Sequence, residues 1–177
     1  VHHPDEIGEI FDEVSYSKGA SIIRMLADYL GEKDFRDGLR YYLKKHSYKN
    51  TETLHLWQAF EKVSKKPVAK MMHNWTSKSG YPVIKVTSDL KISQERFFAN
   101  PVSKSKSKDK TIWKVPISFI NEKFTKLNFG EAGFYRTAYS KELLEKLMSP
   151  VQDKTLSSWD RLGIIRDLFA LAEAGTV

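Results

Sequence analysis

The segment Ser15-Tyr16-Ser17-Lys18-Gly19 is the part of the sequence whose residue types could do chemistry. Lys18 near a helix N-terminus opposes the helix dipole, and Gly19 in a first helical turn costs about 1 kcal/mol relative to alanine. A segment that breaks two local rules for stability can be meeting a functional requirement instead. A phenol held at a helix start could donate a hydrogen bond to a developing oxyanion. The alternative, a tyrosine that only packs against the helix, stays open on this local pattern.

The histidines do not show the spacing of a metal site. Zinc peptidases usually place two histidines four residues apart on a helix, with a glutamate directly after the first. The chain has no cysteine, and this pattern is absent from its five histidines, which are His2, His3, His46, His55 and His73. A glycine-rich phosphate loop and a Gly-x-Ser-x-Gly elbow are absent as well. We therefore predict no metal-ligating and no cofactor-binding residues in this chain, with Tyr16 as its one candidate catalytic residue.

The charge of the chain is positive but unevenly distributed. The net charge is +7 over 177 residues, and much of the excess lies in Ser103–Lys110. Such a run is usually a solvated loop, and this one has no interleaved aromatic residues on which bases could stack. We therefore expect no nucleic-acid partner. We expect no membrane partner either, because no apolar run approaches the roughly 18–20 residues that span a bilayer. The lack of cysteine fits a cytoplasmic location.

The first half of the sequence has the periodicity of helices that could position Tyr16. Apolar residues recur at helical spacing in 17–30, 34–45 and 52–63, with Gly31 as a stop and Thr51 as an N-cap. Pro67 suits the first turn of a fourth helix, which Ser79-Gly80 ends. The part of the chain from Ser17 to Ser79 is therefore predicted to form helices.

The second half changes to a period of two and then returns to helix. Alternation predicts strands at 82–86, 91–97 and 113–119, with further short strands at 124–129 and 134–139. A helix is predicted at 140–148. A last helix, capped by Ser157 or Ser158, carries Leu162, Ile165, Leu168, Phe169 and Leu171 and ends at Gly175. An amphipathic helix needs a surface that covers its apolar stripe, which predicts that the chain is part of something larger.

Several separate motifs resemble one enzyme family. They are the segment Ile10–Ser21; Trp75 with Ser79-Gly80-Tyr81-Pro82-Val83; Gln94-Glu95-Arg96-Phe97; Trp113-Lys114-Val115-Pro116-Ile117; Asn128 with Gly133-Phe134-Tyr135-Arg136 and Tyr139; and Asp160-Arg161 with Asp167, Phe169, Leu171, Ala172 and Ala174-Gly175. Together they resemble the zinc aminopeptidases that include aminopeptidase N, puromycin-sensitive aminopeptidase and the archaeal tricorn-interacting aminopeptidases. One departure is that only ten residues separate Ile117 from Asn128, where family members usually have a longer β segment.

The resemblance implies an α+β, multi-domain fragment. Residues 1–79 would form the helical end of a thermolysin-like catalytic domain, 80–150 a small β-sandwich, and 151–177 the start of a C-terminal helical domain. The family's zinc motif lies upstream, so this chain resembles an internal fragment that lacks it and is expected to be inactive alone. The expected partners are peptide substrates and the remaining N-terminal and C-terminal domains of the same protein.

What carries over from the resemblance is the role of Tyr16. In the family, the tyrosine of this motif donates its hydroxyl to the oxyanion of the tetrahedral intermediate when N-terminal residues are removed from peptides. The parent would use zinc, with ligands outside this chain. The competing hypothesis is a non-enzymatic interaction or assembly module built from the β-sandwich and the helices.

Overall fold

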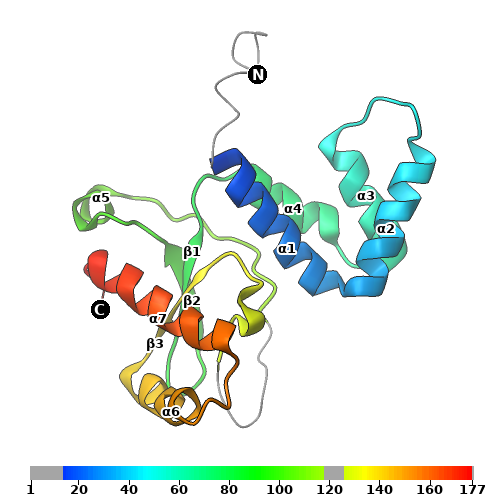
Figure 1. Ribbon diagram of the computed structural model, residues 1–177. Coiled ribbons are helices and arrows are strands. Elements are labelled where there is room, and N and C mark those ends of the chain that lie inside the picture. The colour runs from blue at the N-terminus through cyan, green and yellow to red at the C-terminus, as the bar shows by residue number, and fades with distance from the viewer. Residues whose placement is uncertain (1–13, 118–125, 177) are drawn as a thin grey trace. The chain divides into compact units, whose positions relative to one another are not determined.

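The computed structural model describes residues 14–117 and 126–176, without the side chains of Val14 and Ser15. The chain divides into two compact units, Val1–Ser77 and Lys78–Val177. The first is helical and the second combines helices with a small sheet (Figure 1). This confirms the mixed α+β class, while the finer division at residues 79 and 150 stays a prediction. None of the described helices is long and apolar enough to cross a membrane.

The first unit is a set of consecutive helices. A π-helix, Val14–Lys18, continues directly into α1, Gly19–Leu30; α2, Glu32–Lys45, α3, Thr53–Ser64, and α4, Val68–Thr76, follow. The predicted helices are confirmed, with bounds shifted by at most three residues. Gly31 separates α1 from α2 at a φ of 85°, where glycine avoids the strain of a side chain.

Two details of this unit follow from side-chain contacts. The predicted N-cap at Thr51 is wrong: α3 begins at Thr53 with Glu52 as its N-cap, and the Thr51 hydroxyl lies 2.7 Å from the hydroxyl of Tyr42.

Helices α2 and α3 approach closely because Gly38 has no side chain. A Cβ there would overlap the ring of Phe60, which stacks on Phe35 with ring centroids 5.1 Å apart.

The second unit is built on a three-stranded sheet in the order β2-β1-β3. Its strands are β1, Pro82–Val86, β2, Ile92–Arg96, and β3, Arg136–Tyr139. β2 pairs antiparallel with β1, while β3 pairs parallel with it and sets Val83 opposite Arg136. The central strand β1 is the most buried, and Ile84 and Val86 join Leu127, Tyr135 and Leu143 in a core cluster.

Two predicted strands are not found in the described residues. Residues 113–117 form no strand, and the side chain of Gln94 bonds both backbone groups of Trp113: Nε2 donates to its carbonyl and Oε1 accepts from its N–H. Residues 127–129 turn instead, because Asn128 adopts a left-handed φ of 54°. Residues 118–125, with the rest of both predicted strands, lie outside the described residues. The lysine and serine run, predicted as a loop, begins inside a short helix, α5, Pro101–Lys106, which Asn100 caps.

The last two helices begin at serine caps. α6, Lys141–Gln152, follows Ser140, and α7, Ser158–Glu173, follows Ser157, whose side chain accepts from the N–H of Asp160. The predicted apolar stripe of α7 is only partly buried. Its inward face consists of Asp160, Gly163, Ile164, Asp167 and Leu171, whereas Trp159, Leu162, Ile165 and Phe169 are exposed. Polar contacts therefore supply much of the attachment of α7.

Candidate functional site

Tyr16 lies in the π-helix that leads into α1. π-helical turns are rare and occur frequently at functional sites. No break separates this turn from α1, because Lys18 has the helical dihedral angles φ −65° and ψ −45°. The Tyr16 side chain is 62% exposed, which excludes a place in the core of the unit. The phenol is therefore placed where a ligand could meet it, and simple core packing does not explain it.

The described histidines do not assemble a metal site. His46 and His55 stack on each other between α2 and α3, and His73 is exposed on α4. Within residues 14–117 and 126–176, no three histidine, aspartate, glutamate or cysteine side chains gather in a way that could hold a metal ion. His2 and His3 lie outside this part. The residues that can be tested thus do not fit a zinc site.

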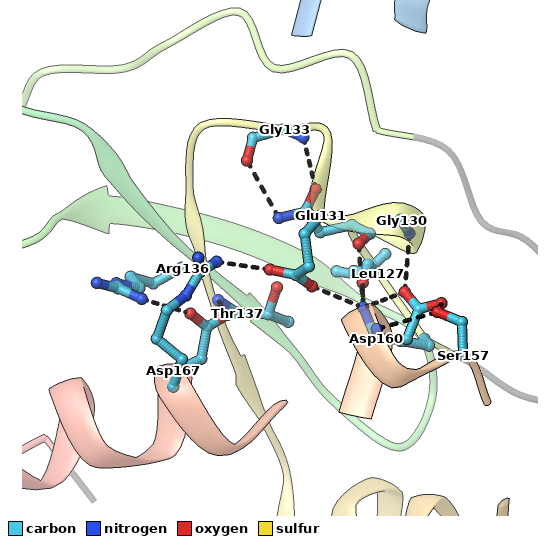
Figure 2. Close-up of polar contacts among 12 residues, drawn as sticks. Leu127, Gly130, Glu131, Gly133, Arg136, Thr137, Ser157, Asp160 and Asp167 are labelled. Carbon is cyan, nitrogen blue, oxygen red and sulfur yellow. Dashed lines mark hydrogen bonds and ion pairs between the residues drawn. The ribbon is translucent and has the colours of Figure 1, made fainter. Parts of the chain in front are cut away.

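A second group of polar residues gathers in the sheet-containing unit, where the loop before β3 meets α7 (Figure 2). Its centre is Lys126, which is 2% exposed. Its Nζ donates to the carbonyl oxygens of Leu127 and Asn128 at 2.9 and 3.0 Å and lies 2.9 Å from Oε1 of Glu131. The same Nζ lies 3.0 Å from Oδ1 of Asp160 on α7. We call these residues, with Arg136, Arg166 and Asp167, the buried charge cluster.

Asp160 joins the loop to the start of α7. Its Oδ1 accepts from the backbone N–H of Gly130 at 2.8 Å, and its Oδ2 accepts from the hydroxyl of Ser157 at 2.6 Å. The carboxylate is fully buried, so each of these partners compensates part of its lost hydration. The loop is also closed on itself, because the side chain of Asn128 bonds both backbone groups of Gly133.

Further along α7, Asp167 binds β3. Its Oδ1 lies 3.0 Å from the guanidinium of Arg136, and its Oδ2 accepts from the backbone N–H of Thr137 at 2.8 Å. Arg166 reaches back to the loop and donates to Oε2 of Glu131 at 2.6 Å. Three cations thus face three carboxylates across the contact between α7, the loop and β3.

Burial governs the electrostatics of this cluster. It raises the pKa of Glu131 above its usual value, an effect that the charge of Lys126 opposes. Burial likewise raises the pKa of Asp167, against hydrogen bonds from Thr137 and Arg136. Gly163 leaves room for the Glu131 carboxylate, which a Cβ at this position would overlap. Because the charged groups bind one another and the backbone, we interpret the cluster as structural rather than catalytic.

The buried charge cluster explains why some of the motif residues are charged, and it contains two further residues that the sequence analysis does not identify. Arg136, Asp160 and Asp167 were identified only as parts of motifs, and the structure brings all three together across 31 residues of sequence. Lys126 and Glu131 were missed. A lysine gives no signal of burial by its residue type, since lysine is almost never buried unless it is paired.

Comparisons with known proteins agree with the motifs. Residues 1–75 match the Peptidase family M1 domain, and residues 124–177 match the ERAP1-like C-terminal domain. The Tricorn protease-interacting factor F2 of Thermoplasma volcanium is 39% identical over 193 aligned positions, which cover 99% of this chain and 24% of that protein.

Relatives of similar identity occur in other organisms. Aminopeptidase M1-D of Oryza sativa subsp. japonica is 38% identical over 99% of this chain and 24% of its own length. Glutamyl aminopeptidase of Bitis rhinoceros is also 38% identical, over 99% of this chain and 22% of its own length. The chain thus spans about a quarter of the curated relatives it matches, and the resemblance to the aminopeptidase family is confirmed.

Proposed function

We propose that this chain is part of a zinc-dependent aminopeptidase that removes N-terminal residues from peptides, and that Tyr16 stabilises the oxyanion of that reaction. The observation that carries the proposal is the match of residues 1–75, which include Tyr16, to the Peptidase family M1 domain. Relatives of this chain are named as aminopeptidases in plants and snakes. The exposure of Tyr16 in a π-helical turn supports the same role.

The proposed chemistry of this chain is hydrogen-bond donation by one hydroxyl. When water adds to a peptide carbonyl, negative charge moves onto the carbonyl oxygen, and the Tyr16 O–H would donate to it. A donor held on a helical segment needs little reorganisation as the charge develops. Because the described residues do not fit a zinc site, the metal ligands would lie in other parts of the parent protein.

The test is Tyr16→Phe in the intact parent enzyme. Loss of one oxyanion donor typically costs about 2.7–4 kcal/mol, or about 100- to 1000-fold in kcat. Phenylalanine keeps the aromatic ring of Tyr16, so zinc content and thermal unfolding should match the wild type. Tyr48→Phe is the matched control, since Tyr48 lies in the same unit and is fully exposed. Activity of Tyr16→Phe within a few-fold of wild type, measured on an aminoacyl-nitroanilide, would remove Tyr16 from the mechanism.

The alternative is an interaction or assembly module. One observation favours it: α7 exposes Trp159, Leu162, Ile165 and Phe169, which is more apolar surface than a solvated helix normally presents. The isolated 177-residue chain separates the two candidates. As part of an enzyme it should bind no stoichiometric zinc and leave aminoacyl-nitroanilides intact, yet restore activity when mixed with the missing remainder of the parent. A module should bind its partner without that remainder.

The finer architecture and the location belong to the same proposal. Residues 1–79 would complete a thermolysin-like domain, 80–150 a β-sandwich, and 151–177 would begin a helical domain in the parent. Its partners would be peptide substrates and its own remaining domains. The absence of cysteine supports a cytoplasmic location, in agreement with a reducing compartment.

A further inference from the structure

Two histidines meet where α2 ends and α3 begins. His46 is the C-cap of α2, and His55 lies in the first turn of α3. Their rings stack, with centroids 4.9 Å apart and an angle of 18° between the planes. The pair therefore connects the two ends of the segment that joins these helices, residues 46–52.

His55 also accepts a hydrogen bond that caps α3. The backbone N–H of Glu52 donates to Nδ1 of His55 at 3.1 Å. An imidazole nitrogen can accept only when it carries no proton, so this bond requires an unprotonated Nδ1. Proton uptake at Nδ1 would replace an acceptor by a second donor facing the Glu52 N–H, and the bond would be lost.

His46 is held in surroundings that disfavour its charged form. Its Nε2 is buried, and within the described part of the chain it has no hydrogen-bond partner. Burial lowers the pKa of His46 below its usual value of 6.5, and the neighbouring His55, Lys45 and Lys49 lower it further. The other titratable groups facing the pair are Tyr42, whose ring lies against His46, and Glu52.

We infer that the stacked pair His46–His55 is a pH-sensitive contact. It stabilises the α2–α3 connection while both rings are neutral and is lost when the rings are protonated. Two stacked imidazolium rings would repel each other beside Lys45 and Lys49, and the cap at Glu52 would be lost at the same time. Because His46 binds a proton more weakly when the two rings are stacked, proton uptake favours the state in which the stack is broken. The stabilisation by this contact is fully present above pH 6.5 and is lost as the pH falls through the lowered pKa of His46.

The test is amide hydrogen exchange of the full chain, read residue by residue and corrected for the intrinsic pH dependence of exchange. Between about pH 7.5 and 5.0, the Glu52 amide should lose about tenfold of its protection, the effect expected when its one hydrogen bond to Nδ1 of His55 is lost. The variant His46→Phe keeps a ring that can stack, and His55→Asn keeps an acceptor near the Glu52 N–H. Neither replacement titrates in this range, so the double variant should lose less than about twofold.

The matched control is His73→Gln, which removes an exposed histidine of the same unit. It should retain the full response of the wild type. An undiminished loss of Glu52 protection in the double variant would overturn the inference, and so would its disappearance in His73→Gln. If His46→Phe folds poorly, His55→Asn alone decides the question, because it should abolish the pH response of the Glu52 amide while leaving His46 in place.

Discussion

Nζ of Lys126 lies 3.0 Å from Oδ1 of Asp160, and the two side chains are only 2% and 0% exposed. A buried ammonium and a buried carboxylate both lose their hydration, and each is tolerated because the other stands beside it. This pair joins the loop before β3 to the first turn of α7. It does so on a helix whose inward face carries two aspartates, while several of its large apolar residues point outward.

Removal of the buried ammonium should destabilise the second unit. Lys126→Met leaves Glu131 and Asp160 without their shared cation, and breaking one side of a buried ion pair typically costs about 3–5 kcal/mol. Urea-dependent hydrogen exchange of the β3 amides would measure this loss. Combination with Asp160→Asn should cost less than the sum of the single changes, because contacting residues are coupled by about 0.5–3 kcal/mol.

Lys91→Met is the control for that change. Lys91 pairs with Asp89 at 2.7 Å, but its side chain is 84% exposed, so its removal should leave the stability of the unit nearly unchanged. Equal effects of the two variants would mean that the burial of Lys126 contributes nothing.

The attachment of α7 to β3 should depend on Asp167. Asp167→Ala leaves the half-buried Arg136 guanidinium without its carboxylate and the Thr137 N–H without its acceptor. The expected loss is again about 3–5 kcal/mol, because an uncompensated buried charge and an unsatisfied donor remain. Relative to the wild type, Asp167→Ala should accelerate hydrogen exchange of the β3 amides more than that of the α2 and α3 amides, which belong to the other unit. Uniform acceleration in both units would contradict this assignment.

Gly163→Ala should destabilise, although alanine normally favours a helix over glycine by about 1 kcal/mol. A methyl group at 163 would overlap the Glu131 carboxylate, and overpacking a buried site typically costs about 1–3 kcal/mol. Gly19→Ala is the matched control, since a Cβ at this helical glycine meets nothing within 4 Å. Thermal unfolding should therefore move down for Gly163→Ala and stay level or rise for Gly19→Ala. The same direction in both would refute the contact with Glu131.

The free energy of unfolding of the second unit should depend on Asp109 at acidic pH. Hydrogen bonds from Thr111 and from Arg96 lower the pKa of Asp109 from 3.8 to about 2. A lowered pKa means that the unfolded chain takes up the proton first, so this stabilisation is present above pH 3.8 and is lost as the pH falls toward 2. Asp109→Asn should flatten the stability curve in that interval, as followed by acid unfolding of the second unit. An unchanged slope would show that Asp109 titrates alike in both states.

The helices of the first unit could be predicted well because their signals are local. Apolar spacing and the stop at Gly31 are properties of neighbouring residues, and the observed bounds lie within three residues of those predicted. Strand β1 was predicted with its observed bounds for the same reason. The strand expected at 113–119 is not found at 113–117, where a side chain 19 residues away, Gln94, bonds both backbone groups of Trp113, a contact that neighbouring residues do not reveal.

The sequence by itself determined the family resemblance, the candidate catalytic residue Tyr16 and the order of most helices and strands, because motifs and periodicity are properties of residues close together in the chain. Only the tertiary structure showed that Lys126, Glu131, Arg136, Asp160 and Asp167 share one buried cluster, and that His46 stacks on His55. Burial and charge pairing depend on distances between residues far apart in the chain. The exposure of Tyr16 likewise depends on the packing of its unit, and it places the side chain outside the core, while the catalytic role of Tyr16 stays a proposal.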